Sequence, residues 1–225
     1  MIKFENVSKV YNDDFTALDE IDLEIKDGEF VSIIGPSGAG KSTFLKLIYA
    51  EEAPSDGVVY FENEPLNEIK RSKLPFHRRK IGTVFQDFKL LPKKNVFENV
   101  AYALEVAGFP QEEILEDVPQ ILEIVGLLDK AEKFPRELSG GEQQKVVLAR
   151  ALIHKPKVII ADEPTGNLDP DSSMDILKLL QSINKIGNTI ILASHDKDLI
   201  NKAGSRVISM KRGKVLTDTA KGKYI

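Results

Sequence analysis

The chain has 225 residues, a formal net charge of −4 and no cysteine. Its composition, 42% hydrophobic and 29% charged, is that of a globular protein. The lack of cysteine excludes disulfides and thiolate metal sites, and the net charge gives no reason to expect a nucleic-acid partner. No stretch approaches the roughly 18 consecutive apolar residues that a membrane helix needs, and the N-terminus shows no apolar segment typical of export.

The first part of the chain predicts an antiparallel β layer. Apolar residues alternate with polar ones from Ile2 to Val7 and, more strictly, from Leu18 to Ile25. The dipeptide Asp27-Gly28 is a hairpin signal, so we expect the second strand to turn there into a buried strand over residues 30–34.

A phosphate-binding loop follows that buried strand, because residues 35–42 match G-x-x-x-x-G-K-[ST] at every fixed position. Apolar residues at helical spacing come after it, which predicts a strand, a loop and a helix. The free N–H groups of the helix and the charge of Lys41 would then bind an anion, and the hydroxyl of Ser42 would reach Mg²⁺. A Gly-rich turn without function would explain the glycines but not Lys41 and Ser42 behind them.

The middle of the chain changes to helices. A basic stretch from Lys70 to Lys80 is interpreted as a solvated face, with an anionic partner as the alternative. Asn95 and Glu98 form a capping-box pattern ahead of the helical region, which runs from about residue 95 to about residue 155. Pro119 lies within it and predicts a kink or a new helix start.

The last part predicts a parallel sheet covered by helices on both faces. Apolar runs over residues 158–161 and 189–193 are separated by a helical pattern. Asp162 and Glu163 follow the first run, and His195 follows the second. These side chains therefore stand at strand ends, where open α/β sheets bind ligands.

Many classes of protein contain a phosphate-binding loop, and a second glycine-rich motif indicates which class this chain resembles. Ser139, Gly140 and Gly141 open a helix, and alone they could be a simple helix cap or a second anion site. Placed behind a phosphate loop and just ahead of Asp162 and Glu163, the motif resembles the signature of the ABC ATPase family. Glu142 departs from the glutamine that many members carry there.

The resemblance extends over nearly the whole chain and implies a fold. It implies an α/β P-loop NTPase of the ABC ATPase type, with a parallel core sheet, an antiparallel β layer and a helical subdomain. Residues 1–225 would form a single ABC ATPase domain. Its ATPase core with the β layer would comprise residues 1–87 and 157–225, and the helical subdomain with the signature would comprise residues 88–156.

The resemblance also implies Mg²⁺-dependent ATP hydrolysis and assigns the site. Tyr11 is similar to the aromatic residue that stacks on adenine, and Asp169 lies in a segment similar to the D-loop. The expected catalytic residues are Glu163, His195, Gln86 and Lys41. The expected metal ligands are Ser42, Gln86 and Asp162. The expected nucleotide-binding residues are Tyr11, Gly35, Pro36, Ser37, Gly38, Ala39, Gly40, Lys41, Ser42, Thr43, Ser139, Gly140, Gly141 and Asp169.

In this family the signature faces ATP held by another copy, so the resemblance implies an ATP-dependent homodimer. Residues 162–169 resemble a subgroup that includes lipoprotein-release and macrolide-export ATPases. Residues 45–49 with Glu51 and Glu52, together with residues 79–91, most closely resemble the FtsE family of cell-division ATPases. That likeness implies an integral membrane permease of the FtsX type as partner and a peripheral position on the cytoplasmic side of the cell membrane. A related exporter ATPase is the nearer alternative, and a soluble ABC ATPase acting in translation or DNA repair is the remote one.

The expected docking site for the permease follows Gln86. Four apolar residues there could form a cleft between the ATPase core and the helical subdomain, with core packing as the alternative: Phe88, Leu90, Leu91 and Phe97.

Overall fold

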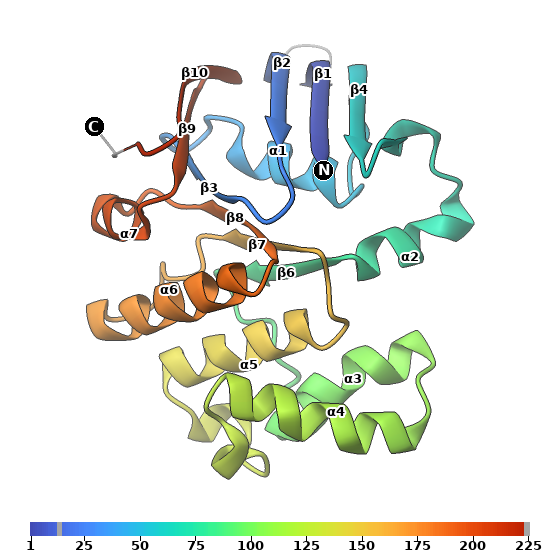
Figure 1. Cartoon of the computed structure of the whole chain (residues 1–225), viewed down its shortest axis with the longest axis vertical. Coiled ribbons are helices and arrows are strands. Elements are labelled where there is room, and N and C mark those ends of the chain that lie inside the picture. The colour runs from blue at the N-terminus through green and yellow to red at the C-terminus, as the bar shows by residue number, and fades with distance from the viewer. Residues whose placement is uncertain (13–14, 223–225) are drawn as a thin grey trace.

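The computed structural model describes residues 1–12 and 15–222 (Figure 1). Its strands are β1 (Ile2–Tyr11), β2 (Phe15–Ile25), β3 (Phe30–Ile34), β4 (Asp56–Phe61), β5 (Glu64–Pro65), β6 (Ile81–Phe85), β7 (Val158–Asp162), β8 (Thr189–Ala193), β9 (Arg206–Lys211) and β10 (Lys214–Thr219). Its α-helices are α1 (Lys41–Ile48), α2 (Leu74–Arg79), α3 (Val96–Ala107), α4 (Gln111–Ile124), α5 (Gly140–Leu152), α6 (Pro170–Lys185) and α7 (Lys197–Ala203). Within the described residues, no helix is long and apolar enough to cross a membrane.

Two sheets organise the described chain. The first is antiparallel, with strand order β2-β1-β4-β5, and the second has the order β10-β9-β3-β8-β7-β6. In the second sheet every neighbouring pair is parallel except β10 with β9. The expected parallel core sheet and antiparallel β layer are confirmed.

The expected hairpin at Asp27-Gly28 is wrong, because β2 and β3 belong to different sheets. The turn carries the chain from one sheet to the other. Residues from the C-terminal part of the chain hold it in place. The Gly28 N–H donates to Thr189 Oγ1 over 3.0 Å, and Asn184 Nδ2 donates to the Gly28 carbonyl over 2.9 Å. A turn dipeptide predicts the bend but not the partner strand.

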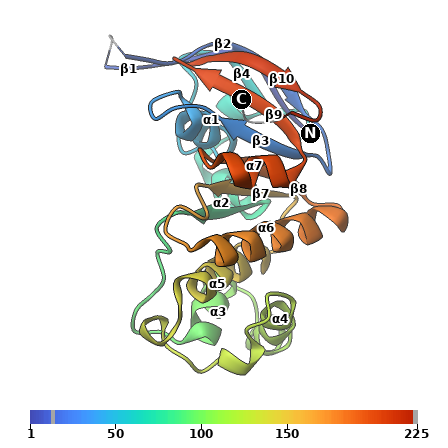
Figure 2. The ribbon, with the colours of Figure 1, turned by 90° about the vertical axis from the view of Figure 1, so that its left-hand side faces the viewer.

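The sheets and helices stack in layers, with α1 between the two sheets and α5 and α6 beneath the core sheet (Figures 1 and 2). Successive residues of β7 alternate between the two hydrophobic clusters. Val158 and Ile160 belong to the cluster on the α1 side, whereas Ile159 and Ala161 belong to the cluster on the helical side. This two-residue period is the geometry of a strand buried on both faces.

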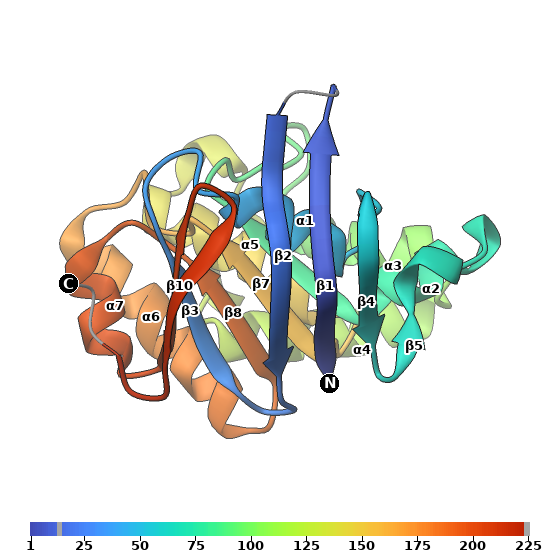
Figure 3. The ribbon, with the colours of Figure 1, turned by 90° about the horizontal axis from the view of Figure 1, so that it is seen from above.

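Helix α1 is fixed against the antiparallel layer, which lies over it when the molecule is seen from above (Figure 3). The rings of Phe4 in β1 and Phe44 in α1 are stacked with centroids 4.3 Å apart. Both side chains are almost fully buried. This contact orients the helix that begins at the phosphate-binding loop.

The helical region has the predicted capping box at Asn95, and Ser139, for which a helix cap was the alternative interpretation, also caps its helix. Asn95 and Glu98 form a capping box at the start of α3, and Ser139 and Glu142 form another at the start of α5. Helix α4 runs through Pro119, so of the two expected outcomes, a kink or a new helix start, the new start is wrong. Proline costs an internal hydrogen bond, but Val118 and Leu122 are fully buried and hold the helix against its neighbours.

Most of the basic stretch is exposed, as expected for a solvated face, including Lys70, Arg71, Lys73 and Arg78, but His77 near its end is buried. His77 Nε2 donates to the Ile48 carbonyl over 2.8 Å, and Arg78 donates to the carbonyls of Tyr49 and Ala50. These carbonyls lie at the C-terminal end of α1, where backbone acceptors lack helical partners. The side chains of α2 therefore cap the helix that follows the phosphate-binding loop.

Burial lowers the pKa of both His77 and His154. Below a pH of about 6.5, an unfolded chain takes up protons on these side chains that the folded protein does not. We therefore expect the free energy of unfolding to fall between pH 7.5 and pH 5.5, by up to about 1.4 kcal/mol per histidine and pH unit. Urea denaturation at a series of pH values measures the slope. The double variant His77→Gln with His154→Gln should have a shallower slope, and an unchanged slope would contradict this origin.

Candidate active site

The phosphate-binding loop joins β3 to α1, as the sequence predicted. Gly40 precedes α1 with φ of 102°, in the left-handed region that favours glycine. A Cβ at this position would lie 2.5 Å from the carbonyl oxygen of Ala17 in β2. Glycine therefore lets the loop close against the β layer. The first turn of α1 carries no acidic residue, which leaves its N–H groups available to an anion.

Lys41 lies inside this loop and is 9% exposed. Its Nζ donates to the Gly35 carbonyl over 2.7 Å and to the Pro36 carbonyl over 3.3 Å. These contacts hold a full positive charge beside the N-terminus of α1, where the helix dipole also favours a negative ligand.

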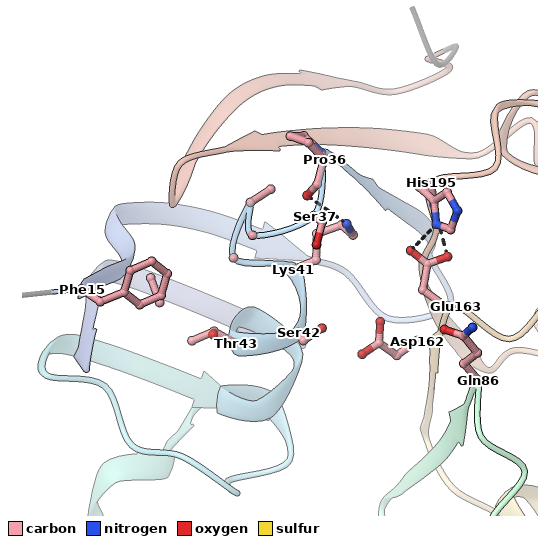
Figure 4. Close-up of a pocket in the computed structure, with 14 residues that line it drawn as sticks. Phe15, Pro36, Ser37, Lys41, Ser42, Thr43, Gln86, Asp162, Glu163 and His195 are labelled. Carbon is pink, nitrogen blue, oxygen red and sulfur yellow. Dashed lines mark hydrogen bonds and ion pairs between the residues drawn. The ribbon is translucent and has the colours of Figure 1, made fainter. Parts of the chain in front are cut away.

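Three side chains from the ends of β7 and β8 face the loop across a cavity of about 600 Å³ (Figure 4). They are Asp162, Glu163 and His195, and the predicted placement at neighbouring strand ends is confirmed. Burial raises the pKa of Asp162, while a hydrogen bond with Ser42 acts in the opposite direction. A nearby cation would lower this pKa, because an opposite charge favours the charged form of the carboxyl.

Glu163 and His195 form a close pair on this wall. His195 Nδ1 lies 2.9 Å from Glu163 Oε1, and the His195 backbone N–H donates to Glu163 Oε2 over 3.3 Å. Glu163 has φ of 49°, an uncommon value for a residue other than glycine. Its backbone N–H donates to the Ala193 carbonyl over 2.9 Å, which fixes this unusual turn at the end of β7.

Gln86 follows β6 and lines the same cavity. A smaller cavity of about 240 Å³ is also lined by Ser42, Gln86 and Asp162, the three expected metal ligands. The structure thus brings a hydroxyl, an amide and a carboxylate together from three segments of the chain. Among the described residues, no three His, Cys, Asp or Glu side chains gather into a metal-binding group.

The residues expected to act on a second copy's nucleotide lie outside the large cavity. Ser139, Gly140, Gly141 and Asp169 do not line it. They lie together instead, because a Cβ at Gly141 would be 2.7 Å from Ser172 Oγ, and that serine donates to Asp169 Oδ2 over 2.6 Å. The starts of α5 and α6 therefore form one local surface.

Tyr11 also lies outside the cavity lining, while Phe15 lines it and was not predicted. The two residues are opposite each other in the β1–β2 pair. Lys9 Nζ lies 4.9 Å from the centre of the Tyr11 ring, and the Phe15 side chain is 57% exposed. Ala17, two residues after Phe15, also lines the cavity. The pairing of β1 with β2 is irregular between Thr16 and Leu18, so alternation along the sequence of β2 did not identify Phe15.

Comparisons with known proteins identify the family of this chain. The ABC transporter family model matches residues 18–166. The chain is 50% identical to the cell division ATP-binding protein FtsE of Bacillus subtilis over 224 residues, which is 100% of this chain and 98% of the relative. It is 47% identical to FtsE of Mycobacterium tuberculosis, over 100% of this chain and 98% of that one.

A solved structure shows the same fold. It is a dimeric ATP-binding cassette in a post-hydrolysis state, bound to ADP and Pi, and it superposes with a TM-score of 0.88 at 37% identity over all of both chains. A sequence identity of 37% over both chains indicates a shared family and not only a shared fold. The chain therefore belongs to the ABC transporter family of ATPases and, within it, to the FtsE group of cell division ATP-binding proteins.

Proposed function

We propose that the large cavity binds ATP and positions it for hydrolysis with Mg²⁺. The observation that carries this proposal is the cavity itself, which places the phosphate-binding loop opposite Asp162, Glu163 and His195. Lys41 and the N–H groups of the loop would hold the β- and γ-phosphates. Phe15 and Tyr11, paired across β1 and β2, would provide an aromatic contact for the base.

The residues at the smaller cavity fit Mg²⁺. Ser42, Gln86 and Asp162 offer oxygen atoms, which are the ligands that Mg²⁺ takes in nucleotide sites. When bound, the metal would neutralise charge on the phosphates. Ser42 and Gln86 would contact it directly, and Asp162 would hold its water shell.

Glu163 would orient the attacking water and take up its proton. The contacts of Glu163 with His195 hold its carboxylate at the edge of the cavity. His195 would contact the γ-phosphate and would lose this contact after hydrolysis. Phosphoryl transfer needs positioning and charge stabilisation more than covalent chemistry, and these groups supply both.

We propose further that two copies form a head-to-tail dimer when ATP binds. Ser139, Gly140, Gly141 and Asp169 lie outside the cavity of their own chain. In a dimer they could face the ATP held by the other copy. The dimeric ADP-bound cassette with the same fold supports this arrangement.

We also propose that the ATPase works in cell division on the cytoplasmic side of the membrane, beside a permease of the FtsX type. Full-length identity to proteins named as cell division ATP-binding protein FtsE supports this role. It favours the cell-division assignment over an export ATPase or a soluble ABC protein.

The proposed docking site is the segment after Gln86. Phe88, Leu90 and Phe97 are half-buried and pack against the hydrophobic cluster of the helical region. Arg150 in α5 donates to the carbonyls of Phe88 and Lys89 over 3.2 Å and 2.9 Å, which fixes the segment. The partly exposed rings of Phe88 and Phe97 are therefore held against this cluster.

We expect Phe88→Asp to abolish co-purification of the permease from detergent-solubilised membranes, because a carboxylate in an apolar contact is costly. ATP affinity should remain unchanged. Leu216→Asp, at a residue of β10 that is 57% exposed, is the matched control and should retain the permease. A complex that survives Phe88→Asp would refute this docking site, and recovery of an export permease would replace the cell-division role.

A further inference from the structure

Two amide side chains join the segment after β6 to the segment after β7. Gln86 Nε2 donates to Asn167 Oδ1 over 3.3 Å. In return, Asn167 Nδ2 donates to the Gln86 backbone carbonyl over 3.4 Å. The pair links residues that are 81 positions apart in the chain. None of the roles assigned above uses Asn167.

These hydrogen bonds give the Gln86 side chain a direction. An amide has a donor end and an acceptor end, and only the oxygen can contact a cation. With the nitrogen held by Asn167, the oxygen is turned to the opposite side. Figure 4 shows the Gln86 oxygen toward Asp162 and the nitrogen away from it. That is the orientation a metal ligand requires.

Gly166 also contacts the Gln86 side chain. A Cβ at this position would lie 2.8 Å from Gln86 Nε2 and 2.9 Å from Gln86 Cδ. Real Cβ contacts are not so short, so the backbone at Gly166 packs directly against the amide group. The glycine leaves space for Gln86, and Asn167 holds its nitrogen.

We propose that Asn167 is a positioning residue for the metal site, which orients the amide of Gln86 so that its oxygen faces Mg²⁺. Groups that hydrogen-bond to a metal ligand fix its orientation and strengthen metal binding. The inference rests on the proposed role of Gln86 as a ligand. It adds a residue that does not touch the metal and acts through Gln86.

Mn²⁺ binding tests the proposal without any turnover. The readout is the affinity for Mn²⁺, measured by electron paramagnetic resonance with the non-hydrolysable ATP analogue AMP-PNP in excess. We expect Asn167→Leu to weaken Mn²⁺ binding by about tenfold. Asn167→Asp keeps the acceptor oxygen and should recover most of the affinity. Gln120→Leu, which changes an exposed amide of α4, is the control and should bind Mn²⁺ like the unmodified protein.

A double-mutant cycle with Gln86→Ala tests whether Asn167 acts through Gln86 or by another route. If Asn167 acts through Gln86, adding Asn167→Leu to Gln86→Ala should cause no further loss of Mn²⁺ affinity. An equal loss with and without Gln86 would show that Asn167 acts elsewhere, for instance on a second copy, and would overturn the proposal. Unchanged Mn²⁺ affinity in Asn167→Leu would overturn it as well.

The same variants also test the assumption that Gln86 is a metal ligand, separately from the role of Asn167. If Gln86→Ala alone leaves Mn²⁺ affinity unchanged, then Gln86 is not a metal ligand, and the proposed metal site fails together with this inference. If Gln86→Ala weakens Mn²⁺ binding and Asn167→Leu does not, only the inference fails. Binding of AMP-PNP in excess EDTA should be equal in all variants, which confirms that the fold and phosphate loop are intact.

Discussion

ATP hydrolysis by the Glu163→Gln variant is expected to be about 10²- to 10⁴-fold slower than that of the unmodified protein. Glutamine cannot accept the proton of the attacking water. Its Oε1 can still accept the hydrogen bond that the His195 N–H makes with Glu163. The pocket should therefore keep its shape, and ATP binding should persist. Phosphate release under saturating Mg-ATP measures the rate.

The control for this variant is Glu123→Gln, which removes a charge from an exposed residue of α4. It should hydrolyse ATP at the unmodified rate. If Glu163→Gln retained full turnover, another group would have to orient the water, and the assignment of Glu163 would be wrong.

The second large effect is expected from Lys41→Ala. The buried ammonium is held at the loop by the carbonyls of Gly35 and Pro36 and supplies charge-assisted hydrogen bonds to the phosphates. A hydrogen bond to a charged group contributes about 1.5–3 kcal/mol, and several phosphate oxygens lose their partner at once. We expect ATP binding to fall about 100-fold or more, below detection by calorimetry at micromolar concentrations.

Lys46→Ala provides the matched control on the same helix. Lys46 lies 3.3 Å from Glu51 in an ion pair and is absent from the cavity lining. Its removal should leave ATP affinity unchanged, because an exposed ion pair contributes little. Unchanged affinity in Lys41→Ala would refute the role of Lys41, provided that thermal unfolding shows both variants to be folded.

Local sequence patterns predicted most of the structural elements. The phosphate-binding loop has a strand before it and a helix after it, and the capping box at Asn95 formed as expected. These features depend on residues close together in the chain. Asp162 and His195 could be placed together because parallel strands end at one edge of a sheet.

Contacts between distant segments could not be predicted in the same way. Asp27-Gly28 marked a turn, but the anchoring groups Thr189 and Asn184 come from the other end of the chain. The basic residues of α2 were expected in solvent because nothing near them in sequence shows the end of α1. The Gln86–Asn167 pair also depends on the strand order of the core sheet.

The central claim is that two copies complete two ATP sites, each with the phosphate-binding loop of one chain and the Ser139 region of the other. Native mass spectrometry of Glu163→Gln with Mg-ATP tests it most directly. We expect a complex of two chains and two nucleotides, which is lost when Ser139→Arg is added because a large charged side chain blocks the shared surface. A single chain carrying one ATP at saturating nucleotide, with no dimer, would show that the two ATP sites are not shared between copies.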